Sequence, residues 1–174
     1  MQADVTTFHL EMTDRAQFRP VPMDRAGVEL KQAEIVCPEL NHFFYTAVGG
    51  DWFWVDRLGW TCDQWHAWLD RPEVETWVLY VSGTPAGYFE LESQPGDNVE
   101  IAYFGLLPEA IGHGIGRWWL AEVISEAWSL PGTSRVWVHT CTLDGPAAMA
   151  TYTGRGLRPI AREVEWRMPD RHTA

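Results

Sequence analysis

The chain has 174 residues, with 24 acidic and 13 basic side chains and a formal net charge of −11 at pH 7. Such a chain is poorly suited to bind a nucleic-acid backbone or an anionic membrane, and no apolar run approaches the roughly 18 residues that a membrane span needs. There is no signal-peptide pattern, and the three cysteines show neither disulfide nor zinc-site spacing. We therefore expect one cytoplasmic domain over residues 1–174, monomeric or homodimeric, with no metal and no nucleic-acid or membrane partner.

The first half of the chain alternates between β-like and helical patterns. Residues 5–12 are predicted to form a strand. Residues 34–47 have helical spacing, with Pro38 tolerated near the first turn. Residues 61–69 can form a short helix that begins with the capping box of Thr61 and Gln64. The inner side of the first helix is expected to carry Ile35, Leu40, Phe43, Phe44 and Ala47.

Three β-rich runs follow at 76–81, 86–94 and 99–107, separated by turns rich in Gly, Pro, Asn and Asp, which predicts an antiparallel meander. A helix over 114–128, a strand over 135–141, a helix from 144 or 145 to 154–156, and a strand over 163–168 complete the pattern. The order predicts an α/β fold, in which a mixed, mostly antiparallel sheet is covered by helices on both faces. Residues 169–174 are expected to form a loose tail.

The connection between the strand at 99–107 and the next helix carries glycine at every second position, at Gly112, Gly114 and Gly116. Glycine allows a tight turn and close backbone approach, and amides at the start of a helix favour an anion. A P-loop would need Gly-Lys-Ser/Thr here, whereas Gly116 is followed by Arg117 and Trp118. A dinucleotide fold would need this turn early in a βαβ unit. The loop predicts a phosphate cradle of another kind, with a simple strand–helix turn as the plain alternative.

Two blocks of sequence resemble the GCN5-related N-acetyltransferase (GNAT) superfamily. In the first, the run 101–108 leads into the three glycines; in the second, the strand at 136–139 precedes Ala148, Tyr152, Gly156 and Leu157. The resemblance covers roughly residues 76–168. It implies the GNAT-type acyl-CoA N-acyltransferase fold, with residues 76–168 as the acetyl-CoA-binding core and residues 1–75 as the acceptor-side part.

The resemblance also implies how acetyl-CoA, the expected acyl donor, would bind. Its pyrophosphate would lie on the amides of the glycine loop, its pantetheine arm would pair with strand backbone near Leu106, and Tyr152 would protonate the leaving thiolate. A plain core tyrosine is the alternative interpretation of Tyr152. The residues expected to contact acetyl-CoA are Leu106, Leu107, Gly112, His113, Gly114, Ile115, Gly116, Arg117, Asp144 and Ala148.

Three positions depart from the family pattern. Ile111 stands where Gln or Arg is usual, Gly145 where Asn is usual, and Leu157 where Phe is usual. Arg117 or His113 could replace the missing side-chain contact to phosphate. The backbone cradle does not depend on any of these side chains.

Amide formation needs a neutral amine, and an aliphatic amine near pKa 10 is mostly protonated at neutral pH. A base within reach, directly or through one water, is therefore expected. Two-residue alternation would place Glu100 on the same strand face as Phe104 and Leu106, where apolar neighbours would raise its pKa. Glu90 and Glu92 on the neighbouring strand are rivals, and a solvated carboxylate is the plain alternative for all three.

The acceptor side is expected to be aromatic and acidic. Five of the eleven tryptophans fall within residues 52–68, and residues 51–100 hold ten acids against two arginines. Trp52 and Trp54, with Asp51 and Asp56, are expected to line a pocket that favours a cationic amine. The i, i+3 spacing of Trp65 and Trp68 instead indicates packing of a helix.

The sequence therefore predicts an enzyme, an N-acetyltransferase that moves an acetyl group from acetyl-CoA to a primary amine of a small molecule or peptide by direct attack in a ternary complex. His139 and Cys141 share a strand face, but with no acid partner evident for them a covalent cysteine mechanism is not expected. The alternatives are a non-catalytic acyl-CoA sensor or interaction module on the same fold, and an aromatic-rich carbohydrate- or cation-binding domain.

Overall fold

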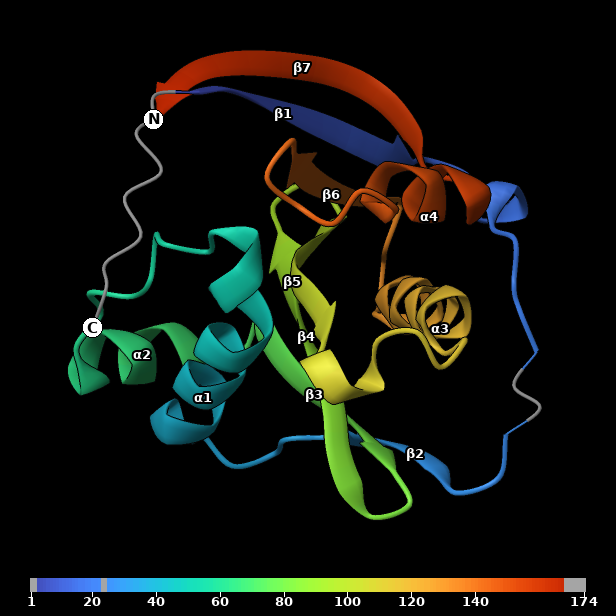
Figure 1. The fold of residues 1–174 in the computed structure, drawn as a ribbon. Helices are drawn as coiled ribbons and strands as arrows, with labels where there is room; N and C mark the ends of the chain where they lie inside the picture. The colour runs from blue at the N-terminus through green and yellow to red at the C-terminus, as the bar shows by residue number, and fades with distance from the viewer. Residues whose placement is uncertain (1–2, 23–24, 168–174) are drawn as a thin grey trace.

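The computed structural model describes residues 3–22 and 25–167. Its strands are β1 (Ala3–Met12), β2 (Val28–Gln32), β3 (Val74–Val81), β4 (Thr84–Gln94), β5 (Asn98–Leu106), β6 (Arg135–Cys141) and β7 (Arg158–Arg167). They form a seven-stranded sheet in the order β2-β3-β4-β5-β6-β1-β7 (Figure 1). Neighbouring strands are antiparallel except β5 and β6, which are parallel. This confirms the predicted mixed, mostly antiparallel sheet.

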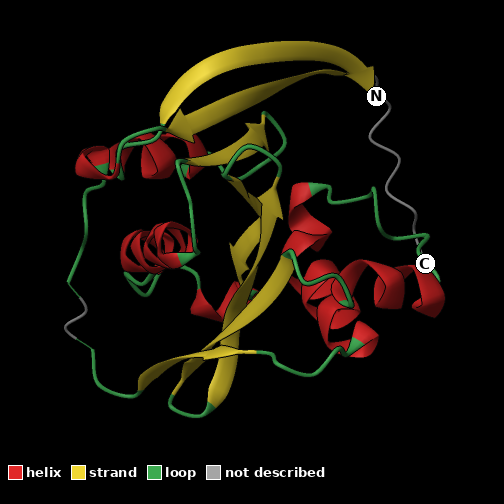
Figure 2. Cartoon of the chain, turned by 180° about the vertical axis from the view of Figure 1, so that it is seen from behind, coloured by secondary structure: helices red, strands yellow, loops and turns green. Residues whose placement is uncertain are grey.

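Helices cover both faces of the sheet, as predicted. α1 (Pro38–Gly49) and α2 (Cys62–Leu69) lie on one face, and α3 (Gly116–Ser129) and α4 (Ala148–Gly154) lie on the other (Figures 1 and 2). The larger core lies between the sheet and α3, around Trp119, and a smaller one lies under α1, around Phe44. Each such fully buried side chain stabilises the fold by about 1.5–3 kcal/mol relative to exposure. Within residues 3–22 and 25–167, no helix has both the length and the apolar character needed to cross a membrane.

The first helix begins later than predicted. Pro38 occupies its first turn and Cys37, its N-cap, is non-helical, because the residue before a proline is disfavoured in the α conformation. Ile35 therefore lies outside the helix and is 81% exposed, and Phe43 is 50% exposed, so placing these two on the inner side was wrong. Phe44, in contrast, is fully buried as expected.

Both edges of the sheet differ from the prediction. The edge strand β2 was not anticipated and pairs with β3. At the other edge, β7 begins at Arg158 rather than at residue 163 and pairs with β1. An edge strand tolerates Pro159 because its outer side needs no ladder hydrogen bond. Residue 168, predicted in the last strand, and the predicted tail at 169–174 lie outside the described residues.

β5 contains an extra residue relative to β4. Glu90 pairs with Tyr103 and Leu91 pairs with Ile101, so Ala102 has no partner in the β4 register. Such a β-bulge shifts the alternation of the following side chains by one position and increases the local twist. The bulge lies directly before the part of β5 that approaches the glycine loop.

β5 and β6 separate along their length. Their pairing ends where Glu100 lies opposite Trp137, while β5 runs on to Leu106 and β6 to Cys141. Beyond Glu100, the edge of β5 that faces β6 is therefore not covered by ladder pairing with that strand. The separated strands create the site described next.

Candidate active site

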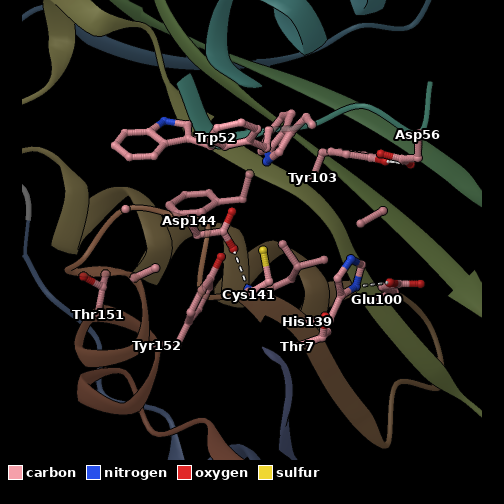
Figure 3. Close-up of a pocket in the computed structure, with 18 of the residues that line it drawn as sticks. Thr7, Trp52, Asp56, Glu100, Tyr103, His139, Cys141, Asp144, Thr151 and Tyr152 are labelled. Atoms are coloured by element: carbon pink, nitrogen blue, oxygen red, sulfur yellow. Dashed lines mark hydrogen bonds and ion pairs between the residues drawn. The ribbon is translucent and has the colours of Figure 1, made fainter. Parts of the chain in front are cut away.

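A cavity of about 670 Å³ opens where β5 and β6 separate. One wall comes from the segment 52–57 after α1 and from β5, and the opposite wall comes from β6, the loop after it and α4. Side chains of β1 and β7 also reach the cavity. Figure 3 shows Trp52 above the opening, Tyr152 at one end, and His139 with Glu100 at the other. Segments that are far apart in sequence therefore meet around one space.

Glu100 lies at the point of separation and is held from two sides. Its Oε1 lies 3.2 Å from Nδ1 of His139, and its Oε2 accepts a hydrogen bond from Nε2 of Gln94 at 2.8 Å. Trp137 in turn donates to Oε1 of Gln94 at 3.0 Å. The Glu100 side chain is 12% exposed and that of His139 is 49% exposed. The hydrogen bond to Glu100 raises the pKa of His139.

The prediction that Glu100 shares a strand face with Phe104 and Leu106 was wrong. Phe104 and Leu106 pack against the core under α3, together with Ile101. Ile101 and Phe104 are three positions apart and would lie on opposite faces of a regular strand, and the bulge at Ala102 accounts for their shared face. Glu100 lies in the cavity lining beside polar neighbours such as Gln94.

Tyr152 combines a position in the core with a place in the cavity lining. It belongs to the core under α3 and is 8% exposed, yet it also lines the cavity. Burial raises the pKa of its hydroxyl, and the nearby charge of Asp144 adds to this effect. The hydroxyl therefore keeps its proton at neutral pH.

Asp144 fixes the loop between β6 and α4. Its Oδ2 accepts hydrogen bonds from the backbone N–H of Cys141, at 2.9 Å, and from the hydroxyl of Thr140. Asp144 and Ala148 both line the cavity, on the side predicted for the acyl donor. Figure 3 places the Asp144 carboxylate near Tyr152.

The glycine loop has the backbone geometry of an anion cradle. Gly112 and Gly114 have φ of +84° and +78°, a region that L side chains rarely adopt. A Cβ at Gly112, Gly114 or Gly116 would meet no atom within 4 Å, so the space above them is open. α3 begins at Gly116 without a side-chain cap, which leaves its first amides for a ligand. These residues fit the pyrophosphate of a CoA thioester.

Only some of the residues predicted to contact acetyl-CoA line the cavity. Its lining includes the predicted residues Leu106, Gly116, Asp144 and Ala148, and also Ile111. Two other predicted contacts are already engaged within the protein: the Leu107 amide donates to the carbonyl of Ala86 at 2.9 Å, and the Ile115 side chain is buried in the core. The lining does not include Gly112, His113, Gly114 and Arg117, which lie in the adjoining loop and helix start.

The predicted aromatic wall is present in part. Trp52 and Trp54 line the cavity, whereas Asp51 is exposed and does not. The ring of Trp52 lies over Gly145, where a Cβ would be 3.4 Å from the nearest ring carbon. Trp54 also packs edge-on against Tyr103, with ring centroids 4.9 Å apart. Trp52 therefore reaches across the cavity mouth to the loop that contains Gly145.

Glu90, one of the predicted bases, has a different environment. It is fully buried and does not line the cavity. Its carboxylate accepts hydrogen bonds from Nη1 of Arg57 at 2.8 Å, Nε1 of Trp68 at 3.1 Å and Nδ2 of Asn41 at 2.9 Å. A carboxylate engaged by three donors, away from the cavity, is placed to compensate Arg57 rather than to take a proton from an acceptor.

Arg57 lies in a box of aromatic rings. Its guanidinium carbon is 4.3 Å from the ring centroid of Trp68, 4.4 Å from that of Tyr103 and 4.6 Å from that of Trp60. Burial is the largest single effect on the pKa of Arg57 and lowers it, but the charge and hydrogen bond of Glu90, together with the neighbouring tyrosines, leave the pKa raised. Part of the tryptophan-rich segment therefore surrounds a cation of the protein itself.

The cavity is acidic. Asp56, predicted with Asp51 to favour a cationic amine, lines it and accepts hydrogen bonds from the hydroxyls of Tyr45, at 2.8 Å, and Tyr103. Among the described residues that line the cavity, Arg57 is the sole lysine or arginine. The carboxylates lining it are Asp56, Glu92, Glu100, Asp144, Glu163 and Glu165.

The sequence model for the "Acetyltransferase (GNAT) family" matches residues 36–157. This range is more than half of the chain, and the chain therefore belongs to the GNAT acetyltransferase family. A comparison with curated proteins gave no significant match.

Solved structures share this fold. A GCN5-related N-acetyltransferase from Kribbella flavida is 20% identical, with a TM-score of 0.66, over 99% of this chain and 62% of that one. One from Sphaerobacter thermophilus is 18% identical, with a TM-score of 0.65, over 92% and 50%. A spermidine N-acetyltransferase from Vibrio cholerae, in complex with CoA and spermine, is 15% identical, with a TM-score of 0.58, over 76% and 81%. The chain thus spans only about half to three-fifths of the first two structures.

Proposed function

We propose that this protein is an N-acetyltransferase that moves an acetyl group from acetyl-CoA to a primary amine of a small molecule or peptide, by direct attack in a ternary complex. The observation that carries the proposal is the cavity between β5 and β6, because it joins the start of α3 at Gly116 to an acidic wall. Membership of the GNAT family supports acyl-CoA as the donor. When bound, acetyl-CoA would supply a thioester carbonyl that an amine can attack.

On the donor side, the amides of the glycine loop and of the first turn of α3 would hold the pyrophosphate. The edge of β5 near Leu106 would pair with the pantetheine arm, because β6 has already separated from it. Tyr152, which lines the cavity, would give its proton to the leaving thiolate. Residues 76–168 would thus form the donor core.

On the acceptor side, residues 1–75 would supply much of the wall, including Trp52 and Asp56. The excess of carboxylates around the cavity favours a cationic amine, as its electrostatic potential attracts positive charge. Trp52, lying over Gly145, would enclose the reacting groups and exclude water. We also propose a cytoplasmic location for this protein.

The test combines binding with turnover. Acetyl-CoA should raise the melting temperature of the purified protein, and thiol should be released from acetyl-CoA when a suitable member of a panel of primary amines is added. The panel should include diamines, amino acids and peptides with free N-termini. Binding without thiol release for any amine would indicate a sensor, and no thermal shift at millimolar acetyl-CoA would contradict the proposal.

A further inference from the structure

The cavity contains a histidine–carboxylate pair at the end opposite Tyr152. His139 and Glu100 approach to 3.2 Å, and Cys141 lies between His139 and Tyr152 (Figure 3). The two partners lie on neighbouring parallel strands at the point where those strands begin to separate. The pair therefore lies at the narrow end of the space in which an acceptor amine would meet a thioester.

We propose that His139 is the general base that removes a proton from the acceptor amine, and that Glu100 is the residue that positions it. This inference rests on the proposed function and names the base within it. It replaces the expectation that Glu100 itself takes the proton.

The geometry assigns different tasks to the two side chains. Both oxygens of Glu100 are engaged, one by His139 and the other by Gln94, and its side chain is only 12% exposed. The His139 side chain is 49% exposed and lines the cavity. An acceptor can therefore reach the imidazole more readily than the carboxylate.

The carboxylate also selects the histidine tautomer. Neutral His139 donates its Nδ1–H to Oε1 of Glu100, so that Nε2 carries the lone pair. Figure 3 shows the second ring nitrogen turned away from Glu100, toward the open cavity. A carboxylate that orients an imidazole in this way also stabilises the imidazolium that forms when the proton is taken.

Other charged groups surround His139. Asp144 follows β6, Asp56 belongs to the segment after α1, and both raise the pKa of His139 after the larger effect of Glu100. His9 of β1 lies beside it, with ring centroids 6.4 Å apart, and is itself 3.7 Å from Glu163 of β7. More carboxylates than cationic groups therefore surround His139. Their negative charge stabilises the imidazolium that forms when His139 takes a proton.

The reaction balances with these residues. The acceptor ammonium loses one proton to Nε2 of His139, directly or through one water, and becomes a neutral amine. The amine lone pair forms the C–N bond at the thioester carbonyl carbon, and the C–S bond breaks. The second proton on nitrogen goes to the thiolate with the Tyr152 hydroxyl as relay, and His139 returns its proton to water.

The first test does not depend on turnover. The His139 ring resonance is followed against pH by NMR in the ¹³C-histidine-labelled protein, and it is assigned by its loss in His139→Gln. Glu100→Gln should lower the pKa of His139, because it removes the charge that favours the imidazolium. Equal titration in wild type and Glu100→Gln would overturn the positioning role of Glu100.

The second test is kinetic. His139→Gln should lower kcat on the order of 100-fold and leave the Kd for acetyl-CoA, measured by calorimetry, unchanged. Glu100→Gln should retain more activity than His139→Gln, because His139 is still present as the base. The rising limb of its pH–rate profile should move to lower pH, because the pKa of His139 is lower in this variant. Added imidazole should restore part of the activity of His139→Ala. His66→Gln, an exposed position in α2 outside the cavity lining, is the matched control.

The outcomes separate the two levels of the proposal. Wild-type rates in His139→Gln, with loss of activity in Glu100→Gln, would assign the base to Glu100 and overturn this inference alone. If the wild type transfers acetyl to no amine, the proposed function and the base role both fail.

Discussion

Arg57 donates a hydrogen bond to Glu90 at 2.8 Å, and the side chains of both residues are buried, 6% and 0% exposed. Arg57 follows α1 and Glu90 lies on β4, so the pair joins the tryptophan-rich segment to the centre of the sheet. A buried pair of this kind is costly to break, because the remaining charge has no solvent to stabilise it. Its main effect is therefore on stability and on the shape of the acceptor wall.

Glu90→Gln should destabilise the protein by about 3–5 kcal/mol, because it leaves the Arg57 guanidinium buried and uncompensated. The free energy of unfolding from urea denaturation measures this. Glu29→Gln is the control, since Glu29 pairs with Lys31 at 3.0 Å on the surface, where both side chains are more than half exposed. That change should cost less than about 1 kcal/mol. Equal losses of unfolding free energy in the two variants would show that the buried pair contributes no more to stability than the surface pair.

Gly114→Glu should abolish the rise in melting temperature that acetyl-CoA produces, because it puts a carboxylate into the anion cradle. Gly83→Glu is a closely matched control: Gly83 has φ of +81° against +78° for Gly114, and a Cβ at either position meets no atom within 4 Å. Both variants introduce the same charge and similar backbone strain, but Gly83 lies in the turn between β3 and β4. Loss of the shift in both variants would point to strain rather than to the cradle.

Trp52→Ala should raise the KM for the acceptor amine by about tenfold, a loss of about 1.4 kcal/mol, because the indole that lies over Gly145 no longer encloses the cavity. Steady-state kinetics with the amine as the varied substrate measures this. Trp52→Phe keeps an aromatic ring, and its KM should lie between those of the wild type and Trp52→Ala. An unchanged KM in Trp52→Ala would remove Trp52 from the acceptor site.

Tyr152→Phe should lower kcat on the order of 100-fold while the protein stays folded, because it removes only the hydroxyl proton that the thiolate would receive. The loss should shrink with an acyl donor whose thiol is more acidic, since such a leaving group needs less protonation. Parallel kcat measurements with the two donors test this. The same loss with both donors would be inconsistent with proton donation.

His139 also gives a pH dependence of stability. Its pKa is raised in the folded state by Glu100, so its contribution is fully present below the unfolded pKa of about 6.5 and is lost as pH rises through the folded pKa. The stability advantage of wild type over His139→Gln should therefore decrease as pH rises from about 6 to about 9. Urea denaturation at a series of pH values measures the difference in free energy of unfolding between the two proteins. A stability advantage of wild type that grows with pH would contradict a raised pKa for His139 in the folded state.

Local sequence signals predicted much of the fold. The turns between β-rich runs predicted β3, β4 and β5, and the glycine spacing predicted the open loop before α3. The capping box of Thr61 and Gln64 correctly located the start of α2. These features depend on neighbouring residues, so a single sequence carries them.

The remaining features depend on contacts between distant segments. His139 and Glu100 are 39 positions apart, and they meet only through the parallel register of β5 and β6. No local pattern marks the extra residue at Ala102, which breaks the alternation on which the expectation for Glu100 relied. Likewise, the insertion of β1 between β6 and β7 follows from long-range pairing.

The most direct test of the account is to follow the acetyl group itself. The protein is incubated with acetyl-CoA that is isotopically labelled in the acetyl group and with the panel of primary amines, and the products are analysed by mass spectrometry. We predict an amine that carries the labelled acetyl group with wild type and with Gly83→Glu, and none with Gly114→Glu. Absence of any labelled amine with the wild-type protein would contradict the account.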